Sequence, residues 1–250
     1  MRRDPAAAIM PFLAKPPGKH LRMPSALVIK ICGLSTAPTL EAALAAKVDM
    51  VGFVFFEKSP RNVSLALADD LGRRVEGRAR KVALCVDADD PTLAAIIARL
   101  QPDLLQLHGA ETPERIAAIR ARFGRPVMKA IGIAQAADLA QIGLYADVAD
   151  WLLFDAKAAR DAATPGGNGR RFDWHLLSGL HVDKPYLLSG GLNADNVGEA
   201  LAITKAPGVD VSSGVESAPG IKDPVAIADF VARARQAAAA RPLGSAAGTA

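Results

Sequence analysis

The sequence predicts a single-domain α/β protein with the (βα)8 architecture of a TIM barrel, and three observations support this. Eight short apolar runs alternate with amphipathic stretches along most of the chain. The runs are apolar at consecutive positions, which is typical of parallel strands that are covered on both faces. The chain has 250 residues, 50% of them hydrophobic and 22% charged, and this suits one barrel with a full core.

The predicted elements follow one another in a regular order. Strands are predicted at residues 26–32, 50–55, 81–86, 104–107, 127–131, 151–154, 186–188 and 209–211. Helices are predicted between them, among others at residues 38–46, 91–100, 113–123, 195–203 and 224–235. Three of these helices have proline in the first turn after a polar residue that can cap the helix: Asp90, Thr112 and Asp223. The units together predict a closed barrel over residues 26–236.

A doubly wound open sheet is the competing interpretation of the same alternation. Such a sheet is expected to carry a glycine-rich nucleotide-binding motif after its first strand. Here the first strand runs into Lys30-Ile31-Cys32-Gly33-Leu34, which is no such motif. No linker rich in proline, glycine or serine divides residues 27–235. We therefore predict the barrel.

The two ends of the chain lie outside this pattern. Residues 1–25 contain Pro11, Pro16 and Pro17 together with several basic side chains. We expect a flexible extension, or a segment that precedes a true start at Met23, and a targeting peptide is the weaker alternative. Residues 237–250 are rich in alanine, which predicts a disordered tail.

Charge, hydropathy and cysteine usage exclude several classes of partner. The net charge of +4 and the pI near 9.2 mildly favour anionic ligands, but the basic residues form no long run, so we expect no nucleic acid. No apolar run approaches the roughly 20 residues of a membrane span, so we expect no membrane. Cys32 and Cys85 permit a disulfide by number alone, but a reduced pair in a cytoplasmic protein is favoured.

The residues at the ends of the strands form the candidate active site, because the carboxyl ends of barrel strands face it. They are Cys32, His108, Lys129 and Asp155, with Arg61 after the second strand. A lone strand cysteine is often a core residue. Arg61 could be a solvated loop residue, His108 a hydrogen-bonded support, and Lys129 a partner of nearby carboxylates. Asp155 is harder to explain structurally, since a carboxylate that ends a buried strand is costly unless hydrogen-bonded or functional.

Two glycine-containing segments after the seventh and eighth predicted strands indicate a phosphate site. Gly190 and Gly191 follow one strand, and Ser213 and Gly214 follow the other. Glycine lets backbone N–H groups approach a ligand, and a helix start adds about half a positive charge. Barrels of this class bind phosphate at this place, so we expect a phosphorylated small-molecule substrate. The loop before the seventh strand, which contains Gly167, is predicted to be a lid that offers further N–H groups.

Taken together in sequence, these segments resemble phosphoribosylanthranilate isomerase from about residue 27 to residue 235. Any one of the motifs is weak, but their order along the chain is specific. The motifs are Lys30-Ile31-Cys32-Gly33, Gly52-Phe53-Val54-Phe55, Ser59-Pro60-Arg61, Gln106-Leu107-His108-Gly109, Leu153-Phe154-Asp155, Gly166-Gly167-Asn168-Gly169-Arg170-Arg171-Phe172-Asp173-Trp174, Ser189-Gly190-Gly191-Leu192-Asn193 and Asp210-Val211-Ser212-Ser213-Gly214-Val215-Glu216. Two departures are Asn168, where threonine is usual, and Ser189, where alanine is common.

The resemblance implies an Amadori rearrangement of tryptophan biosynthesis, from N-(5-phosphoribosyl)anthranilate to 1-(o-carboxyphenylamino)-1-deoxyribulose 5-phosphate. Carried over by position, it makes Cys32 the general base and Asp155 the general acid, without metal or cofactor. Arg61 suits the anthranilate carboxylate, because a guanidinium fork matches a carboxylate. His108 and Gly167 are further candidates for substrate contacts. Members of this family occur as monomers and homodimers.

Some alternatives stay open at this point. The group that activates the thiol of Cys32 is Lys30, Lys129 or His108. Another phosphate-binding barrel, such as an indole-glycerol-phosphate synthase or a histidine-pathway isomerase, is the alternative enzyme. The latter uses paired aspartates, whereas the first strand here ends in cysteine, and the former calls for a mouth rich in lysine. A ligand-binding barrel without catalysis predicts loss of the acid or the base, and both are present.

Overall fold

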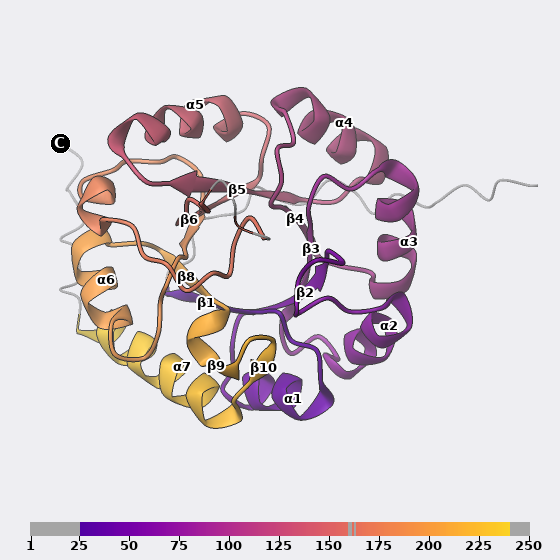
Figure 1. Ribbon diagram of the computed structural model, residues 1–250, viewed down its shortest axis with the longest axis horizontal. Coiled ribbons are helices and arrows are strands. Elements are labelled where there is room, and N and C mark those ends of the chain that lie inside the picture. Colours follow the sequence, from indigo (N-terminus) through magenta and orange to yellow (C-terminus); the bar gives the residue numbers. More distant parts are fainter. Residues whose placement is uncertain (1–25, 160–161, 163, 241–250) are drawn as a thin grey trace, which may run out of the picture.

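The computed structural model describes residues 26–240, apart from residues 160, 161 and 163. Eight parallel strands close into a barrel in the order in which they occur along the chain, and helices surround it (Figure 1). The strands are β1 (Val28–Cys32), β2 (Met50–Phe55), β3 (Arg80–Cys85), β4 (Leu104–Leu107), β5 (Val127–Ile133), β6 (Trp151–Ala156), β7 (Tyr186–Leu188) and β8 (Gly208–Val211). The predicted fold class is therefore confirmed.

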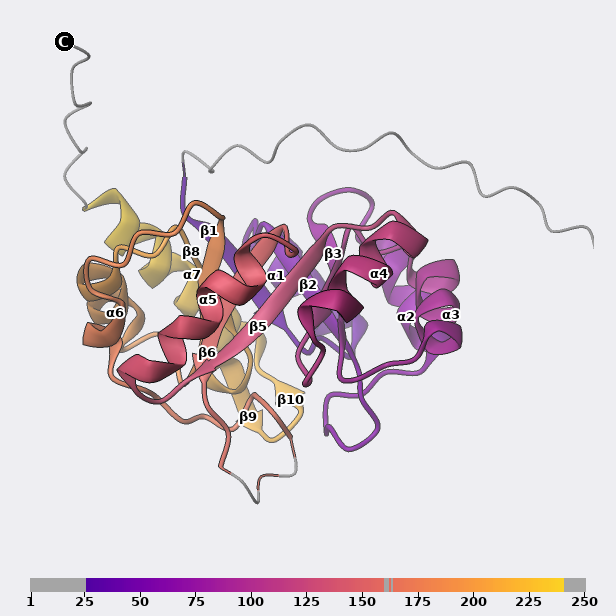
Figure 2. The ribbon, with the colours of Figure 1, turned by 90° about the horizontal axis from the view of Figure 1, so that it is seen from above.

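The helices follow the strands around the barrel. The α-helices among the described residues are α1 (Ala37–Ala45), α2 (Leu65–Arg74), α3 (Asp90–Leu100), α4 (Pro113–Phe123), α5 (Ala140–Ala146), α6 (Val197–Thr204) and α7 (Pro224–Ala239). Short 3-10 turns occur at η1 (Ala136–Leu139), η2 (Trp174–Leu177) and η3 (Ser213–Val215). A hairpin of β9 (Glu216–Ala218) and β10 (Ile221–Lys222) precedes α7 and lies at the end of the barrel where the strands finish (Figure 2).

Two predicted boundaries need correction. The cap of α3 is Asp89, whose carboxylate accepts the Thr92 N–H at 2.9 Å, and not the predicted Asp90. Asp90 already lies in the first turn and pairs with Arg115 from α4. Helix α7 runs to Ala239, so residues 237–239 are helical although the sequence predicts a tail there. The predictions for residues 1–25 and for the end of the tail fall outside the described residues.

Strand alternation divides the core into two layers. The larger layer packs between the barrel wall and the helices. A smaller apolar layer fills the interior of the barrel and consists of Val28, Met50, Val82, Leu104, Met128, Ala130, Trp151, Leu153 and Leu187. Side chains two or four residues further along the same strands point inward and lie nearer the carboxyl ends. Some of these positions are polar (Cys32, Gln106, His108, Asp155 and Ser189) and others are apolar (Val54, Leu84 and Val86), and these eight side chains line a pocket.

The cysteines and the helices bear on two further predictions. Cys32 and Cys85 are both buried and neither forms a disulfide with a described residue, while the predicted reduced state stays a prediction. None of the helices in the described part of the chain has the length and apolar character needed to cross a membrane.

Candidate active site

A pocket opens at the carboxyl ends of the barrel strands. Its wall brings together residues from β1, β4, β6 and β8 and from the loops after β2, β6 and β7. It contains the predicted site residues other than Lys129 and Gly214: Cys32, Arg61, His108, Asp155, Gly167, Gly190, Gly191 and Ser213. Gly214 does not line this pocket. The strand ends thus converge on one site, as the barrel architecture requires.

Cys32 ends β1 above a buried ion pair. Lys30 lies two residues earlier on the same inward face, and its Nζ lies 2.8 Å from Oδ1 of Asp210 on the neighbouring strand β8. Burial raises the pKa of the Cys32 thiol, and the adjacent Lys30 charge opposes part of that rise. Burial also opposes the charge on Lys30, but the interactions with Asp210 and Cys32 together outweigh it and raise the pKa of this lysine. Of the three candidate activators, Lys30 is thus the one beside the thiol.

Lys129 is not at the mouth, contrary to the sequence-based expectation. Its neighbours on β5, Met128 and Ala130, fill the barrel interior, so Lys129 points outward by strand alternation. Its Nζ lies 2.7 Å from Oε2 of Glu111 and donates to the Gly109 carbonyl at 2.6 Å. The lysine therefore fixes the loop after β4 from outside the barrel. This agrees with the alternative that Lys129 is a partner of nearby carboxylates.

Asp155 ends β6 and is held at both oxygens. Oδ1 accepts the Ala156 N–H at 2.8 Å, and Oδ2 lies 3.3 Å from Nε2 of His108. The other ring nitrogen of His108, Nδ1, lies 3.2 Å from Nε2 of Gln106 on β4. The acid candidate and the histidine candidate therefore belong to one chain of polar contacts inside the pocket.

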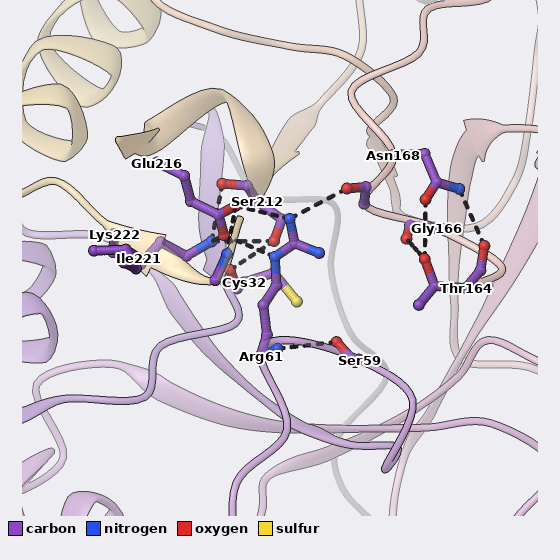
Figure 3. A network of polar contacts seen from close by, with 12 residues as sticks. Cys32, Ser59, Arg61, Thr164, Gly166, Asn168, Ser212, Glu216, Ile221 and Lys222 are labelled. Carbon is purple, nitrogen blue, oxygen red and sulfur yellow. Dashed lines mark hydrogen bonds and ion pairs between the residues drawn. The ribbon is translucent and has the colours of Figure 1, made fainter. Parts of the chain in front are cut away.

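Arg61 forms a two-point ion pair with Glu216, a residue that the sequence analysis did not propose for the site (Figure 3). Its Nε and Nη2 donate to the two oxygens of Glu216 at 2.7 and 2.8 Å, and Nη2 also reaches the Gly167 carbonyl at 3.2 Å. Gly33 has a φ of +79°, and a Cβ there would lie 2.6 Å from Cδ of Arg61. The guanidinium is therefore fixed from the loops after β1 and β6 and from the hairpin after β8.

Glu216 and Lys222 bring the hairpin into the site. Lys222 Nζ donates to Glu216 at 2.5 Å and to the carbonyl and hydroxyl oxygens of Ser212 at 2.9 and 3.1 Å. Burial alone would raise the pKa of Glu216, but Arg61 and Lys222 outweigh it and lower that pKa. Burial lowers the pKa of Lys222. The trio of Arg61, Glu216 and Lys222 carries one net positive charge next to the pocket.

The loop after β6 lies over the pocket. Added Cβ atoms show how close it comes: at Gly166 one would lie 2.7 Å from both Asp155 Oδ2 and His108 Nε2, and at Gly167 one would lie 2.7 Å from Arg61 Nη1. The unusual Asn168 is accommodated by hydrogen bonds of 2.9 and 3.0 Å with Thr164, which close this loop on itself. Its placement over both polar chains suits a cover that excludes water.

Glycine is required in the loops after β7 and β8 for two different reasons, a positive φ in the first loop and a close approach of the chain in the second. Gly190 and Gly191 adopt φ values of +89° and +63°, and their backbone N–H groups, like that of Ser213, make no hydrogen bond with any described residue. Such free donors suit an anion. At Gly214 a Cβ would collide with the carbonyl of Leu192. Gly214 is thus required for the close approach of the two loops.

One part of the pocket is apolar and was not recognised in the sequence. Val54 and Phe56 from the end of β2, and Leu84 and Val86 from β3, line it beside the polar groups. These residues sit in ordinary strand patterns, so nothing in the sequence separates them from core residues. Together they form a slot suited to a flat apolar group. In the described residues, no group of His, Cys, Asp and Glu side chains is arranged to hold a metal ion.

Comparison with known proteins supports the same family as the sequence motifs. Residues 29–233 match the family described as N-(5'phosphoribosyl)anthranilate (PRA) isomerase. The chain belongs to this family. The N-(5'-phosphoribosyl)anthranilate isomerase of Azorhizobium caulinodans is 63% identical over 188 residues, which cover 75% of this chain and 82% of that protein. The resemblance and the predicted enzyme class, a phosphoribosylanthranilate isomerase, are thereby confirmed.

Solved structures of the family share this barrel. The crystal structure of phosphoribosyl anthranilate isomerase from Thermotoga maritima superposes with a TM-score of 0.75 at 30% identity, and the match covers 84% of this chain and 99% of that one. A further crystal structure shows phosphoribosyl anthranilate isomerase in complex with reduced 1-(o-carboxyphenylamino)-1-deoxyribulose 5-phosphate. It has a TM-score of 0.71 at 28% identity, with 84% and 99% of the two chains covered.

Proposed function

We propose that this enzyme acts in the cytoplasm and isomerises N-(5-phosphoribosyl)anthranilate to 1-(o-carboxyphenylamino)-1-deoxyribulose 5-phosphate in tryptophan biosynthesis, with Cys32 as general base and Asp155 as general acid. One observation carries the assignment of roles. Cys32 on β1 and Asp155 on β6 face the same pocket, and β7 and β8, with the glycine loops, lie between them. A substrate whose phosphate binds at those loops places its sugar between the two groups.

The reaction needs one proton donor and one proton acceptor on opposite sides of the sugar. In the first step the Asp155 carboxyl gives its proton to the furanose oxygen, the C1–O bond breaks, and the amine nitrogen forms a Schiff base with C1. In the second step Cys32 takes the proton from C2, and the electron pair of that bond forms an enolamine. The enolamine becomes the ketone when C1 gains a proton and the hydroxyl on C2 loses its own. General acid–base catalysis of this kind contributes about 10²–10⁴-fold per positioned group.

Cys32 acts as a base only as a thiolate, and its surroundings have opposing effects on the pKa of the thiol. Burial raises the pKa of the thiol, whereas Lys30 and Lys222 favour the charged form. An ordinary cysteine with a pKa of about 8.5 is only a few per cent thiolate at pH 7. The Lys30 ammonium therefore supports the proposed role, since it offsets part of the burial effect at the reacting sulfur.

The remaining pocket residues suit the rest of the substrate. The apolar slot of Val54, Phe56, Leu84 and Val86 fits the aromatic ring. Arg61 uses its Nε and Nη2 for Glu216, so its Nη1 is the nitrogen that would meet the substrate carboxylate. The fork-like contact expected from the sequence is thus already made within the protein, and the substrate would receive the remaining end of the guanidinium.

The decisive measurement is the decay of phosphoribosylanthranilate fluorescence, with the substrate generated in situ, on addition of purified protein. Asp155→Asn keeps the shape of the acid and removes its proton, so we expect kcat to fall at least about a hundredfold while KM changes little. A variant that keeps more than about a tenth of the wild-type kcat would remove Asp155 from this role. A ligand-binding barrel without catalysis predicts that the wild-type protein binds the substrate and leaves its fluorescence undecayed.

A further inference from the structure

Gln106 is a buried amide with one end in the site and the other end unpaired. Its side chain points into the barrel from β4, is fully buried and lines the pocket. Its Nε2 lies 3.2 Å from Nδ1 of His108, whereas its Oε1 has no hydrogen-bond partner among the described residues. Buried amides that serve only the fold usually have both ends satisfied. Gln106 is thus placed for its contact with His108 and not for stability alone.

The contact between Gln106 and His108 determines which ring nitrogen carries the proton. An amide nitrogen only donates hydrogen bonds, so Nδ1 of His108 accepts, and the proton of the neutral ring is on Nε2. Nε2 faces Oδ2 of Asp155 at 3.3 Å. The proton of His108 is therefore on the nitrogen that lies 3.3 Å from the Asp155 oxygen free of the Ala156 N–H.

We infer that Gln106 is a positioning residue for the acid: it holds His108 in the Nε2–H form so that His108 stabilises the carboxylate left when Asp155 gives up its proton. The inference rests on the proposed role of Asp155. In that step the Oδ2–H bond breaks, an O–H bond forms on the substrate ring oxygen, and His108 keeps its own proton. The hydrogen bond from Nε2–H strengthens as negative charge develops on Oδ2, which favours the transition state.

The surroundings protect this chain of contacts. The His108 N–H is bonded to the Cys85 carbonyl at 2.9 Å, which fixes the backbone of the histidine. The loop after β6 places Gly166 directly over Asp155 Oδ2 and His108 Nε2, and this cover keeps water from replacing either partner. Low exposure makes a hydrogen bond stronger and an incorrect tautomer more harmful.

Two substitutions of Gln106 separate chemistry from shape. Gln106→Glu keeps the shape, and in its ionised form it only accepts hydrogen bonds, so it pulls the proton to Nδ1 and leaves Nε2 as an acceptor facing Asp155. Gln106→Leu removes the contact without preferring either form. We expect kcat to fall about a hundredfold for the glutamate variant and about tenfold for the leucine variant, with KM within about twofold. Leu105→Met changes the outer face of the same strand and should leave kcat unchanged.

The tautomer itself is measured by ¹⁵N NMR of protein labelled in its histidine side chains, with His108→Asn used to identify the signals. We expect wild-type His108 to show the Nε2–H form and Gln106→Glu to show Nδ1–H. A wild-type Nδ1–H signal, or a glutamate variant with wild-type kcat, would overturn the inference. Full turnover by Asp155→Asn together with an Nε2–H signal would instead overturn the acid role and leave the tautomer assignment standing.

Discussion

The two cysteines of the barrel end strands in the same way yet have opposite surroundings. Cys32 points inward at the end of β1, where Lys30 stands beside the sulfur and favours the thiolate. Cys85 points outward at the end of β3, where burial and the nearby Glu111 carboxylate raise its pKa to about 12. Each thiol has a buried lysine–carboxylate pair nearby, with N···O distances of 2.8 and 2.7 Å. At Cys32 the lysine of the pair influences the thiol most, whereas at Cys85 it is the carboxylate. Cys32 is therefore the candidate base, and Cys85 is a core residue.

The largest expected difference is in turnover. Cys32→Ala should reduce kcat at least about a hundredfold, because alanine cannot accept the C2 proton that the proposed base removes. Cys85→Ala should keep kcat and lose about 1 kcal/mol of stability through the small cavity left in the outer layer. Steady-state kinetics and urea denaturation of both variants provide the test. Equal loss of kcat in the two variants would end the distinction between the thiols.

A second test exchanges the lysines. Lys30→Gln removes the positive charge beside Cys32 but keeps a donor for Asp210, so the pKa of the thiol rises further. We expect kcat at pH 7 to fall about tenfold for each unit of that rise and to recover as the pH is increased. Lys129→Gln is the matched control on the outer face, and its pH–rate profile should follow the wild type. A Lys30→Gln variant slowed by the same factor at every pH would show that the lysine does not tune the thiol.

The smallest expected effect concerns stability in alkali. The pKa of Cys85 is raised to about 12 in the folded protein, so the native state retains its thiol proton where the unfolded chain has lost it. The contribution is therefore fully present below about pH 8.5 and falls by at most about 1.4 kcal/mol per pH unit above it. Urea denaturation at pH 8 and pH 10 under reducing conditions should show a steeper loss for wild type than for Cys85→Ala. Equal losses would mean that the thiol titrates alike in both states.

The sequence predicted the barrel because its strands obey simple rules. The bounds of β2, β4 and β7 match the apolar runs at residues 50–55, 104–107 and 186–188, and the other strands differ by at most two residues at either end. An apolar run that is buried on both faces predicts a strand. It does not show which side chains point into the barrel and which point toward the helices, since both faces are apolar. For this reason Lys129 was expected at the mouth, although it lies one position out of step with the inward-facing residues of β5.

The candidate site was predictable where it depends on strand ends and not where it depends on distant partners. Cys32 and Asp155 follow from their place in the pattern. Glu216, in contrast, meets Arg61 across 155 residues of sequence, and no local spacing indicates that pair. Gly214 stays a predicted phosphate contact through its backbone N–H, and the structure adds a packing reason for glycine there, because a Cβ would collide with the Leu192 carbonyl.

The contacts that hold the site join the two halves of the barrel. Lys30, Arg61 and His108 belong to the first four βα units, and their partners Asp210, Glu216 and Asp155 belong to the last four. Each of these three pairs has one member in each half, and Cys32 and Asp155 are divided in the same way, so neither half alone holds both the proposed base and the proposed acid. During refolding, turnover should therefore return only once both halves of the barrel are in place, later than the return of secondary structure. Turnover by this enzyme therefore reports that the two halves of the barrel have come together.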